Sequence, residues 1–502
     1  MAHNSRNDAP TGRRAPMLKD LVPRKGEKPL PPLEEQGTLH HILHNDSFAA
    51  VLLLTGSVLA FLCANSSLHL EFIGLPLKEF YEKLWHMDFG FAIHTVEVTQ
   101  SLHHWINDGL MAIFFFVVGL EIKREMLIGE LSSVRKAALP IAAALGGMLV
   151  PAIIFYAVNF SGDGAHGWGI PMATDIAFAV GVMGLLSKRV PSSLAVFLMA
   201  LAIVDDLGAV VVIALFYTSS IAATQLFAGL VLIGFSYLLS VLGVRNTLVY
   251  ALLFVLIWLN FLQSGVHATI AGVLFAFTIP LDARYEPTLF SDRIKELLRR
   301  FDNVEHVDGP RIVSARQQRL VRAIENECIY VEAPLQRIEN KLHPITAFII
   351  MPIFAFANAG VQIDFSHVAD QVFSTVSLGV VLGLLLGKQI GITFFSWLVV
   401  KLGLAELPTG VSWKQIYAAS CLGSIGFTMS LFIAELAYAG GGEVVHAAAE
   451  AAGNIDPHVV AHLPEAKIGV LVGSLIAGLY GTLVMYLVTS KPEPGAVSVS
   501  HH

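Results

Sequence analysis

Apolar stretches of about 20 residues recur along this chain. A helix of about that length spans the hydrocarbon core of a bilayer. Only 14% of the 502 residues are charged, whereas soluble domains carry about 25%. We therefore predict an all-α polytopic membrane protein embedded in a lipid bilayer, with about twelve transmembrane helices and no nucleic-acid partner. The predicted spans lie near 48–65, 101–120, 137–158, 167–187, 192–217, 224–243, 247–264, 266–281, 344–361, 376–400, 415–438 and 467–488.

Lysine and arginine gather in the segments that this arrangement places on one side of the membrane. With both termini cytoplasmic, 28 of the 32 Lys and Arg residues fall in cytoplasmic segments. Positive-inside asymmetry of this kind supports that orientation and an even number of spans. We predict a cytoplasmic tail over 1–46, a transmembrane domain over 47–490 and a second cytoplasmic tail over 491–502.

Two connecting segments have patterns of their own. Residues 87–99 alternate weakly between apolar and polar, which predicts an external β-hairpin. The 282–342 segment contains the capping-box pattern Ser-Ala-Arg-Gln at 314–317. We interpret it as a cytoplasmic amphipathic insertion, with a solvated tether as the equal alternative. The three widely spaced cysteines indicate no disulfide framework and no metal motif, and no cofactor is expected.

Two adjacent aspartates, Asp205 and Asp206, lie in the middle of an otherwise uncharged apolar run. A charged side chain at the centre of a membrane helix costs ~2.5–3.5 kcal/mol on insertion scales. Intramembrane carboxylates accordingly mark ion or proton pathways. The pair therefore predicts an ion or proton site inside the membrane.

Two other spans contain residues that interrupt a helix. Asp175 lies near the middle of the fourth span, where Pro171 disfavours a continuous helix. The eleventh span carries Gly423 and Gly426 among hydroxyl residues. Broken helices expose backbone groups and half-helix ends that transporters use to hold ions. Ordinary helix contacts also use such small residues, but an interruption in each half of the chain favours two broken helices.

Lys388 is the one charge near the centre of the tenth span. It either pairs with a buried carboxylate or loses its proton. Since consecutive helical residues point about 100° apart, one of Asp205 and Asp206 can pair with Lys388 while the other faces a cavity and a cation. A salt bridge that only orders the bundle is the alternative. Counting Asp108 and Asp175, four membrane carboxylates face one lysine, and this surplus favours cation or proton binding.

Several titratable residues lie nearer the ends of the spans. Asp108, near the outer end of its helix, is a candidate for an accessory position on the ion path. The other candidates are Glu121 and Glu125 at the inner end of the second span, Arg337, Glu339 and His343 where the 282–342 segment enters the ninth, and His267 at the start of the eighth. A solvated helix end is the alternative for Glu121 and Glu125, and a structural role is the alternative for His267.

Eight motifs along the chain resemble those of the NhaA family of Na+/H+ antiporters. The resemblance covers nearly all of the predicted spans in order. The motifs are ATDIAF at 173–178, AIVDDLGA at 202–209, FAFANAG at 354–360, GSIGFTMS at 423–430, WIND at 105–108, VGLE at 118–121, SGVHAT at 264–269 and GK at 387–388.

The resemblance implies a transporter rather than an enzyme, and an inverted-repeat fold with two broken helices that cross. NhaA is itself one of the transporters from which the inverted-repeat rule was drawn. Asp205 and Asp206 would form the Na+ and proton site, Lys388 would pair with Asp205, and Thr174 and Asp175 would lie at the crossing. Li+ would be carried too.

The resemblance also implies electrogenic exchange that is activated by pH. The pH-response candidates are Glu121, Glu125, Arg337, Glu339, His343 and His267. A homodimer helped by the external hairpin and a place in the bacterial inner membrane are implied as well.

Two other classes of protein use comparable residues. An intramembrane aspartyl protease needs two facing carboxylates, which Asp175 and Asp206 could supply, but the chain contains no Gly-x-Gly-Asp element. An organic-anion/Na+ symporter or a cation channel on a similar fold is the stronger alternative. A symporter for bulky anions should present more cationic groups than the single Lys388.

Overall fold

The computed structural model describes residues 46–66, 69–70, 75–93, 96–160, 162–218, 221–283, 287–303, 314–363, 368–438 and 462–489. All of them belong to one compact unit, Asn45–His502. The predicted tails over 1–46 and 491–502 lie outside the described residues, apart from Asp46.

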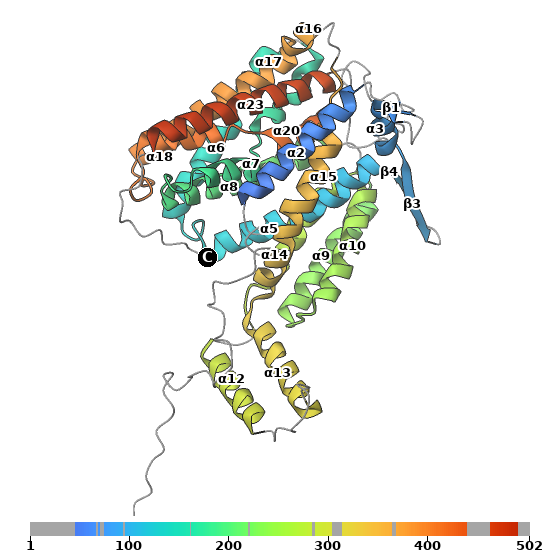
Figure 1. Cartoon of the computed structure of the whole chain (residues 1–502), viewed down its shortest axis with the longest axis vertical. Helices are drawn as coiled ribbons and strands as arrows, with labels where there is room; N and C mark the ends of the chain where they lie inside the picture. The colour runs from blue at the N-terminus through green and yellow to red at the C-terminus, as the bar shows by residue number, and fades with distance from the viewer. Residues whose placement is uncertain are drawn as a thin grey trace, which may run out of the picture. The chain divides into compact units, whose positions relative to one another are not determined.

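Helices account for most of the described chain (Figure 1). The first half contains α2 (Asp46–Asn65), α3 (Leu77–Trp85), α4 (Leu102–His104), the π-helix η2 (Trp105–Leu110), α5 (Met111–Ile128), α6 (Val134–Val158), the 3-10 helix η3 (Asp163–Met172), α7 (Ile176–Leu185), α8 (Ser192–Phe216), α9 (Ala223–Val241), α10 (Thr247–Ser264) and α11 (Ala268–Ala276). The second half contains α12 (Pro287–Asp302), α13 (Ala315–Val331), α14 (Pro334–Ile345), the π-helix η4 (Thr346–Ile350), α15 (Met351–Asn358), α16 (Val368–Val372), α17 (Thr375–Leu382), the π-helix η5 (Gly383–Lys388), α18 (Gln389–Lys401), α19 (Trp413–Leu422), α20 (Phe427–Tyr438) and α23 (Leu463–Val488).

Ten helices in the described residues are long and apolar enough to cross a membrane, and the bent pair α19 and α20 makes eleven. These eleven correspond to eleven of the twelve predicted spans. The predicted span near 266–281 differs, because its helix α11 has only nine residues. Gly265 adopts a left-handed conformation (φ 77°) just before it. At its other end the hydroxyl of Thr278 turns back to the carbonyl of Phe275 and bonds to Ser236 on α9.

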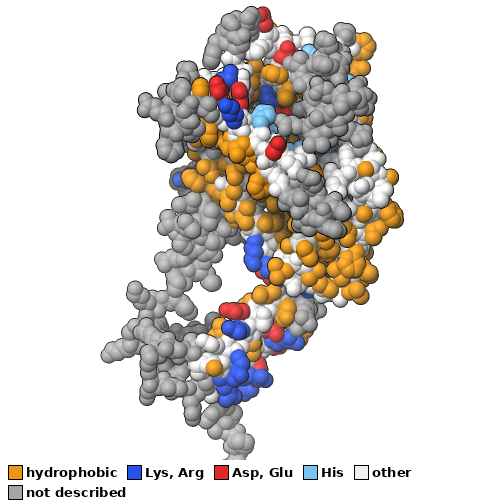
Figure 2. Space-filling view, turned by 90° about the vertical axis from the view of Figure 1, so that its right-hand side faces the viewer, with side chains coloured by type: hydrophobic (Ala, Val, Ile, Leu, Met, Phe, Trp, Pro, Cys, Tyr) orange, Lys and Arg blue, Asp and Glu red, His pale blue; other side chains and the backbone are white. Residues whose placement is uncertain are grey.

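Large apolar side chains point outward from the spanning helices. Phe227, Leu252 and Leu479 are each more than 60% exposed, on α9, α10 and α23. Figure 2 shows hydrophobic side chains spread over much of the visible face. Exposed apolar surface on this scale is unfavourable in water. It is the surface that a lipid-facing bundle requires.

Helices α6 and α18 pack at a glycine contact. A Cβ atom on Gly391 would overlap the backbone of Gly146, and one on Gly146 would overlap the backbone of Gly391. Small residues of this kind let membrane helices approach closely. Helix α18 thereby lies beside α6 (Figure 1), which holds η5 and its Lys388 inside the bundle.

The predicted hairpin is present. Strands β3 (Asp88–Ile93) and β4 (Val96–Ser101) pair antiparallel, with Asp88 opposite Ser101. A second, shorter pair joins β1 (His69–Leu70) to β2 (Leu75–Pro76). Trp105 fixes the β3–β4 hairpin to the bundle, because its indole N–H donates to the carbonyl of Phe89 at 2.6 Å.

The predicted insertion contains two helices that pack against each other, α12 and α13. The capping box at the start of α13 is confirmed. The Ser314 hydroxyl accepts from the backbone N–H of Gln317 at 3.3 Å, and the Gln317 side chain accepts from the backbone N–H of Ser314 at 3.0 Å. Both helices expose charged faces, which include the Arg293–Glu327 ion pair between them.

Candidate functional site

The fourth span is broken where the sequence predicted it. The 3-10 helix η3 ends at Met172, and α7 begins at Ile176. Pro171 lies within η3, where it cannot donate a backbone hydrogen bond. Asp175 caps α7, since its Oδ1 accepts from the backbone N–H of Phe178 at 3.0 Å. The break therefore fixes a carboxylate at the start of a half-helix inside the bundle.

The eleventh span is also broken. Helices α19 and α20 meet at a bend of 51°. Gly423 follows α19, and Gly426 precedes α20. A Cβ atom on Gly426 would lie 3.1 Å from the carbonyl oxygen of Ala173 and 3.0 Å from the side chain of Leu384. A glycine at this position allows the two breaks to touch.

The two breaks are joined by hydrogen bonds. The backbone N–H of Asp175 donates to the carbonyl of Ile425 at 2.7 Å. The Thr174 hydroxyl donates to the carbonyl of Gly423 at 2.8 Å. Thr428 donates both its backbone N–H, at 3.1 Å, and its hydroxyl to Asp175 Oδ2. Backbone groups that each break leaves without a helical partner are thus satisfied by the other break.

Lys388 forms an ion pair with Asp205 inside the bundle. Its Nζ lies 2.7 Å from Asp205 Oδ2, and the two side chains are 0% and 2% exposed. The same ammonium group donates to the hydroxyl of Thr174. A buried charge is tolerated when it is paired and hydrogen-bonded. Lys388 thus links α8, which carries Asp205, to the break before α7.

Asp206 is different from its neighbour. It is completely buried, yet neither of its carboxylate oxygens has a hydrogen-bond partner among the described residues. Asp205 Oδ1 also lacks one. A buried carboxylate without partners carries a desolvation penalty of several kcal/mol. A proton or a cation bound at these three oxygens would offset that penalty.

The charges at this point do not balance. Asp175, Asp205 and Asp206 are all buried, and Lys388 is the buried lysine among the described residues. Carboxylate, hydroxyl and carbonyl oxygens are hard ligands that suit hard cations. The donor set therefore fits a hard cation or protons.

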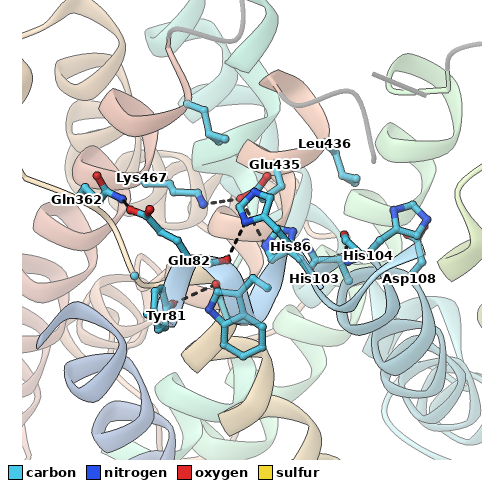
Figure 3. A pocket seen from close by; sticks show the side chains of 16 residues that line it. Tyr81, Glu82, His86, His103, His104, Asp108, Gln362, Glu435, Leu436 and Lys467 are labelled. Carbon is cyan, nitrogen blue, oxygen red and sulfur yellow. Dashed lines mark hydrogen bonds and ion pairs between the residues drawn. The ribbon is translucent and has the colours of Figure 1, made fainter. Parts of the chain in front are cut away.

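A cavity of about 330 Å³ lies beside a different set of predicted residues (Figure 3). Asp108 lines it and pairs with His104, whose Nε2 is 2.9 Å from Asp108 Oδ2. On the same lining, Lys467 pairs with Glu435. Sequence reasoning did not select Glu435 or Lys467. A carboxylate near the end of an apolar span and a lysine at the start of the next span were the available signals.

The pH-response candidates are brought together only in part. Arg124 bridges two of them, since its guanidinium lies 2.6 Å from Glu339 Oε1 and 3.3 Å from Glu125 Oε1. Arg337 instead donates to the carbonyl of Ile329 and to Thr247. On a helix, residues two apart do not face each other, so Arg337 turns away from Glu339.

The remaining candidates occupy other places. Glu121 lies on α5, and His343 is in the last turn of α14. His267 precedes α11, with its Nε2 2.7 Å from the carbonyl of Tyr217. Thr428 holds Asp175 but was not selected as a site residue, although it belongs to one of the motifs. Its signal was its hydroxyl, two residues after the break.

Comparison with known proteins matches the chain to one family. Residues 40–485 match the family model described as Na+/H+ antiporter 1. The chain is 44% identical over 474 residues to the Na+/H+ antiporter NhaA 1 of Saccharophagus degradans, covering 93% of this chain and 96% of that relative. It is 43% identical over 443 residues to NhaA of Sulfurimonas denitrificans, covering 88% and 93%. It is 45% identical over 461 residues to NhaA of Koribacter versatilis, covering 91% and 94%.

Proposed function

Since this chain belongs to the NhaA family of Na+/H+ antiporters, we propose that it exports cytoplasmic Na+ in exchange for external protons at Asp205 and Asp206. The family resemblance predicted from the motifs is confirmed. The protein is a transporter and not an enzyme, so the aspartyl-protease alternative is set aside.

The observation that carries the ion site is the contrast between the two aspartates. Asp205 has its charge compensated by Lys388, whereas Asp206 is buried with both oxygens free of hydrogen bonds among the described residues. A bare buried carboxylate binds a proton or a cation because either one removes the desolvation penalty. One site then serves both ions.

Competition for these carboxylates makes the exchange obligatory. In the inward-facing state, cytoplasmic Na+ displaces protons from Asp206 and Asp205. In the outward-facing state, external protons displace Na+. A ligand shifts the balance between the two states only through its different affinity for each. Li+, a smaller monovalent cation, uses the same oxygens.

The crossing of the broken helices gives this site a polar wall that can move. Asp175 and Thr174 lie at the crossing, and Thr174 also accepts from Lys388. The ends of the half-helices carry partial charges that favour ions. Movement of either broken helix would therefore change the surroundings of Lys388 directly.

The exchange is electrogenic in this proposal. Two adjacent carboxylates offer places for more protons than the Na+ ions that they release. Each surplus positive charge that enters gains ~2.3 kcal/mol per 100 mV of membrane potential. The potential would then drive Na+ export even where the proton gradient is small.

Activation by pH is assigned to the cluster of Arg124, Glu125 and Glu339, which ties α5 to α14. Glu339 Oε2 is buried without a hydrogen-bond partner among the described residues. Protonation of Glu339 would weaken its pairing with Arg124 and loosen this contact between helices. Glu121 on α5, and Arg337 and His343 on α14, would act from neighbouring positions on the same two helices. His267, which precedes α11, would act at the other end of the bundle.

The family resemblance implies which membrane holds the protein, and the charge distribution supports its orientation. The protein would lie in the bacterial inner membrane with both termini cytoplasmic, in keeping with the positive-inside asymmetry.

A homodimer would form through the β3–β4 hairpin. An isolated two-stranded hairpin is marginally stable in water, and its strands offer edges to which a second copy could pair.

Everted membrane vesicles from antiporter-deficient cells test the function. Respiration acidifies the lumen, a fluorescent probe reports the pH difference, and NaCl, LiCl or KCl is then added at several pH values. Dequenching with Na+ and Li+ but not with K+ is expected. Repeating the assay with the membrane potential clamped tests electrogenicity, because clamping should slow the exchange.

Asp206→Asn should abolish the exchange while the protein remains in the membrane. Asp292→Asn is the matched control, since Asp292 lies on α12, far along the chain from the site, and its ion-pair partner among the described residues is the neighbouring Lys295. Full exchange by Asp206→Asn would refute the site. Na+ entry without any pH change in the unsubstituted protein would favour the symporter or channel.

A further inference from the structure

The cavity in Figure 3 lies at the end of the bundle that the proposed orientation makes external. Its lining comes from α3, the start of the second span, the end of α15 and the residues just after it, the end of α20 and the start of α23. We propose that this cavity is a pH-dependent cation filter on the external ion path, in which His103 and His104 set the charge that Na+ meets. The inference rests on the antiport function proposed above.

Carboxylates outnumber cationic groups on the cavity lining. Glu82, Asp108 and Glu435 contribute three negative charges and Lys467 one positive charge, so the formal net charge is −2 while the histidines are neutral. Asp108 and Glu435 are 5% and 8% exposed. Their charges are therefore little screened by bulk water, and they attract a cation in the cavity strongly.

Each of the two buried carboxylates has a histidine as its neighbour. His104 Nε2 lies 2.9 Å from Asp108 Oδ2. His103 Nε2 lies 4.0 Å from Glu435 Oε1, the same carboxylate oxygen that pairs with Lys467. The two histidines are consecutive in the chain. One short segment thus places an imidazole beside each carboxylate.

Histidine is the side chain whose charge ordinarily changes between pH 5 and 8. Protonation of His103 and His104 changes the formal net charge of the cavity lining from −2 to 0. At alkaline external pH the carboxylates would attract Na+, and at acidic external pH the imidazolium groups would repel it. External acidity would thereby hinder the return of Na+ while protons load the core site.

Further groups face the two histidines from the surrounding helices. The amides of Asn107 and Asn358 join His103 to α15, with Asn358 Oδ1 3.1 Å from His103 Nε2. These groups fix the ring but do not titrate. The other titratable groups on the lining or against Asp108 are Tyr81 and Glu82 on α3, His86 just after that helix, and His267 before α11.

Helix α20 connects the filter to the core. Glu435 lies two helical turns after Thr428, on the same face of α20 and roughly 10 Å away along its axis. Thr428 is the residue that holds Asp175. A change in charge at Glu435 therefore acts on the helix that forms one wall of the core site.

Right-side-out vesicles test the filter. With the lumenal pH fixed, Na+ is added outside at pH values from 5.5 to 8.5, and the KM for external Na+ is measured. One added charge about 10 Å from Na+ changes affinity about tenfold at an effective dielectric constant near 20. The variant His103→Gln/His104→Gln removes two such groups, so its KM should be lower than that of the unsubstituted protein by more than about tenfold at pH 6, and equal to it at pH 8.5.

Two single substitutions on the cavity lining should change the KM for external Na+ in opposite directions. Lys467→Met should lower the KM for external Na+ at every pH, and Glu435→Gln should raise it. His462→Gln is the matched control, because His462 pairs with Glu465 at 3.1 Å but does not line the cavity. Everted vesicles report the cytoplasmic face, where the KM should stay unchanged in all four variants. If these side chains had a purely structural role, their substitution would change the KM for Na+ at both faces of the membrane.

Three outcomes overturn the filter: the same KM at pH 6 with and without His103 and His104, KM shifts of the same sign in Lys467→Met and Glu435→Gln, or equal changes on both faces. Absence of exchange in the unsubstituted protein would instead overturn the antiport function itself.

Discussion

The same substitution in two adjacent residues should have different effects on stability. Asp205→Asn removes the partner of Lys388, which is 0% exposed. Asp206→Asn removes a charge that has no hydrogen bond to lose among the described residues. Both variants should lose Na+/H+ exchange. Only Asp205→Asn should be substantially destabilised.

The magnitude follows from the burial of the pair. Breaking a buried ion pair by removing one partner costs about 3–5 kcal/mol, because the other charge stays buried without compensation. Asp206→Asn exchanges a carboxylate for a neutral group of nearly the same size. It removes a desolvation penalty and no hydrogen bond, so we expect a change within about 1 kcal/mol or a gain.

Thermal unfolding of the purified variants in detergent at pH 8, without Na+ or Li+, measures the difference. The double variant Asp205→Asn/Lys388→Met is the internal control. Removing both partners leaves no buried charge, so much of the stability lost in Asp205→Asn should return. Equal unfolding midpoints for Asp205→Asn and Asp206→Asn would refute the assignment of Lys388 to Asp205.

Three further predictions concern the supporting contacts. Thr428→Val should destabilise the protein by about 1–3 kcal/mol, since Asp175 loses a buried hydrogen bond; unchanged thermal unfolding would contradict this. Gly391→Ala should destabilise by about 1–3 kcal/mol, because its Cβ would overlap the backbone of Gly146, and the yield of folded protein checks it. Burial raises the pKa of Tyr81 to about 12, so stability present below pH 10 should fall as the pH rises toward about 12. The Tyr81→Phe variant should not lose stability over this pH range. An equal fall in the thermal stability of both proteins would contradict the prediction.

Local patterns in the sequence were sufficient for the spans and for several helix ends. The lengths of apolar runs predicted eleven spans that the structure contains, and Ser314 and Gln317 predicted the capping box. Pro171 and Gly426 indicated the two broken helices. These features depend on residues within about one span of each other, so hydropathy and backbone preferences report them directly.

The predicted eighth span, near 266–281, is longer than the helix that the structure contains there. Residues 266–281 are apolar enough for a span, but α11 covers only Ala268–Ala276, and beyond its end Thr278 bonds to Phe275 and to Ser236. The hydroxyl of Ser236 comes from a different helix. Composition alone does not show that contact.

The sequence by itself determined that this protein is a helical membrane bundle with carboxylates and one lysine inside it. Reasoning from the residues alone left open which aspartate Lys388 meets, and the packing of η5 against α8 and the break before α7 places it on Asp205. The Glu435–Lys467 pair and its cavity were likewise visible only in three dimensions. Contacts of this kind join side chains that are far apart in the chain, and their formation depends on how helices rotate and pack, which no local pattern specifies.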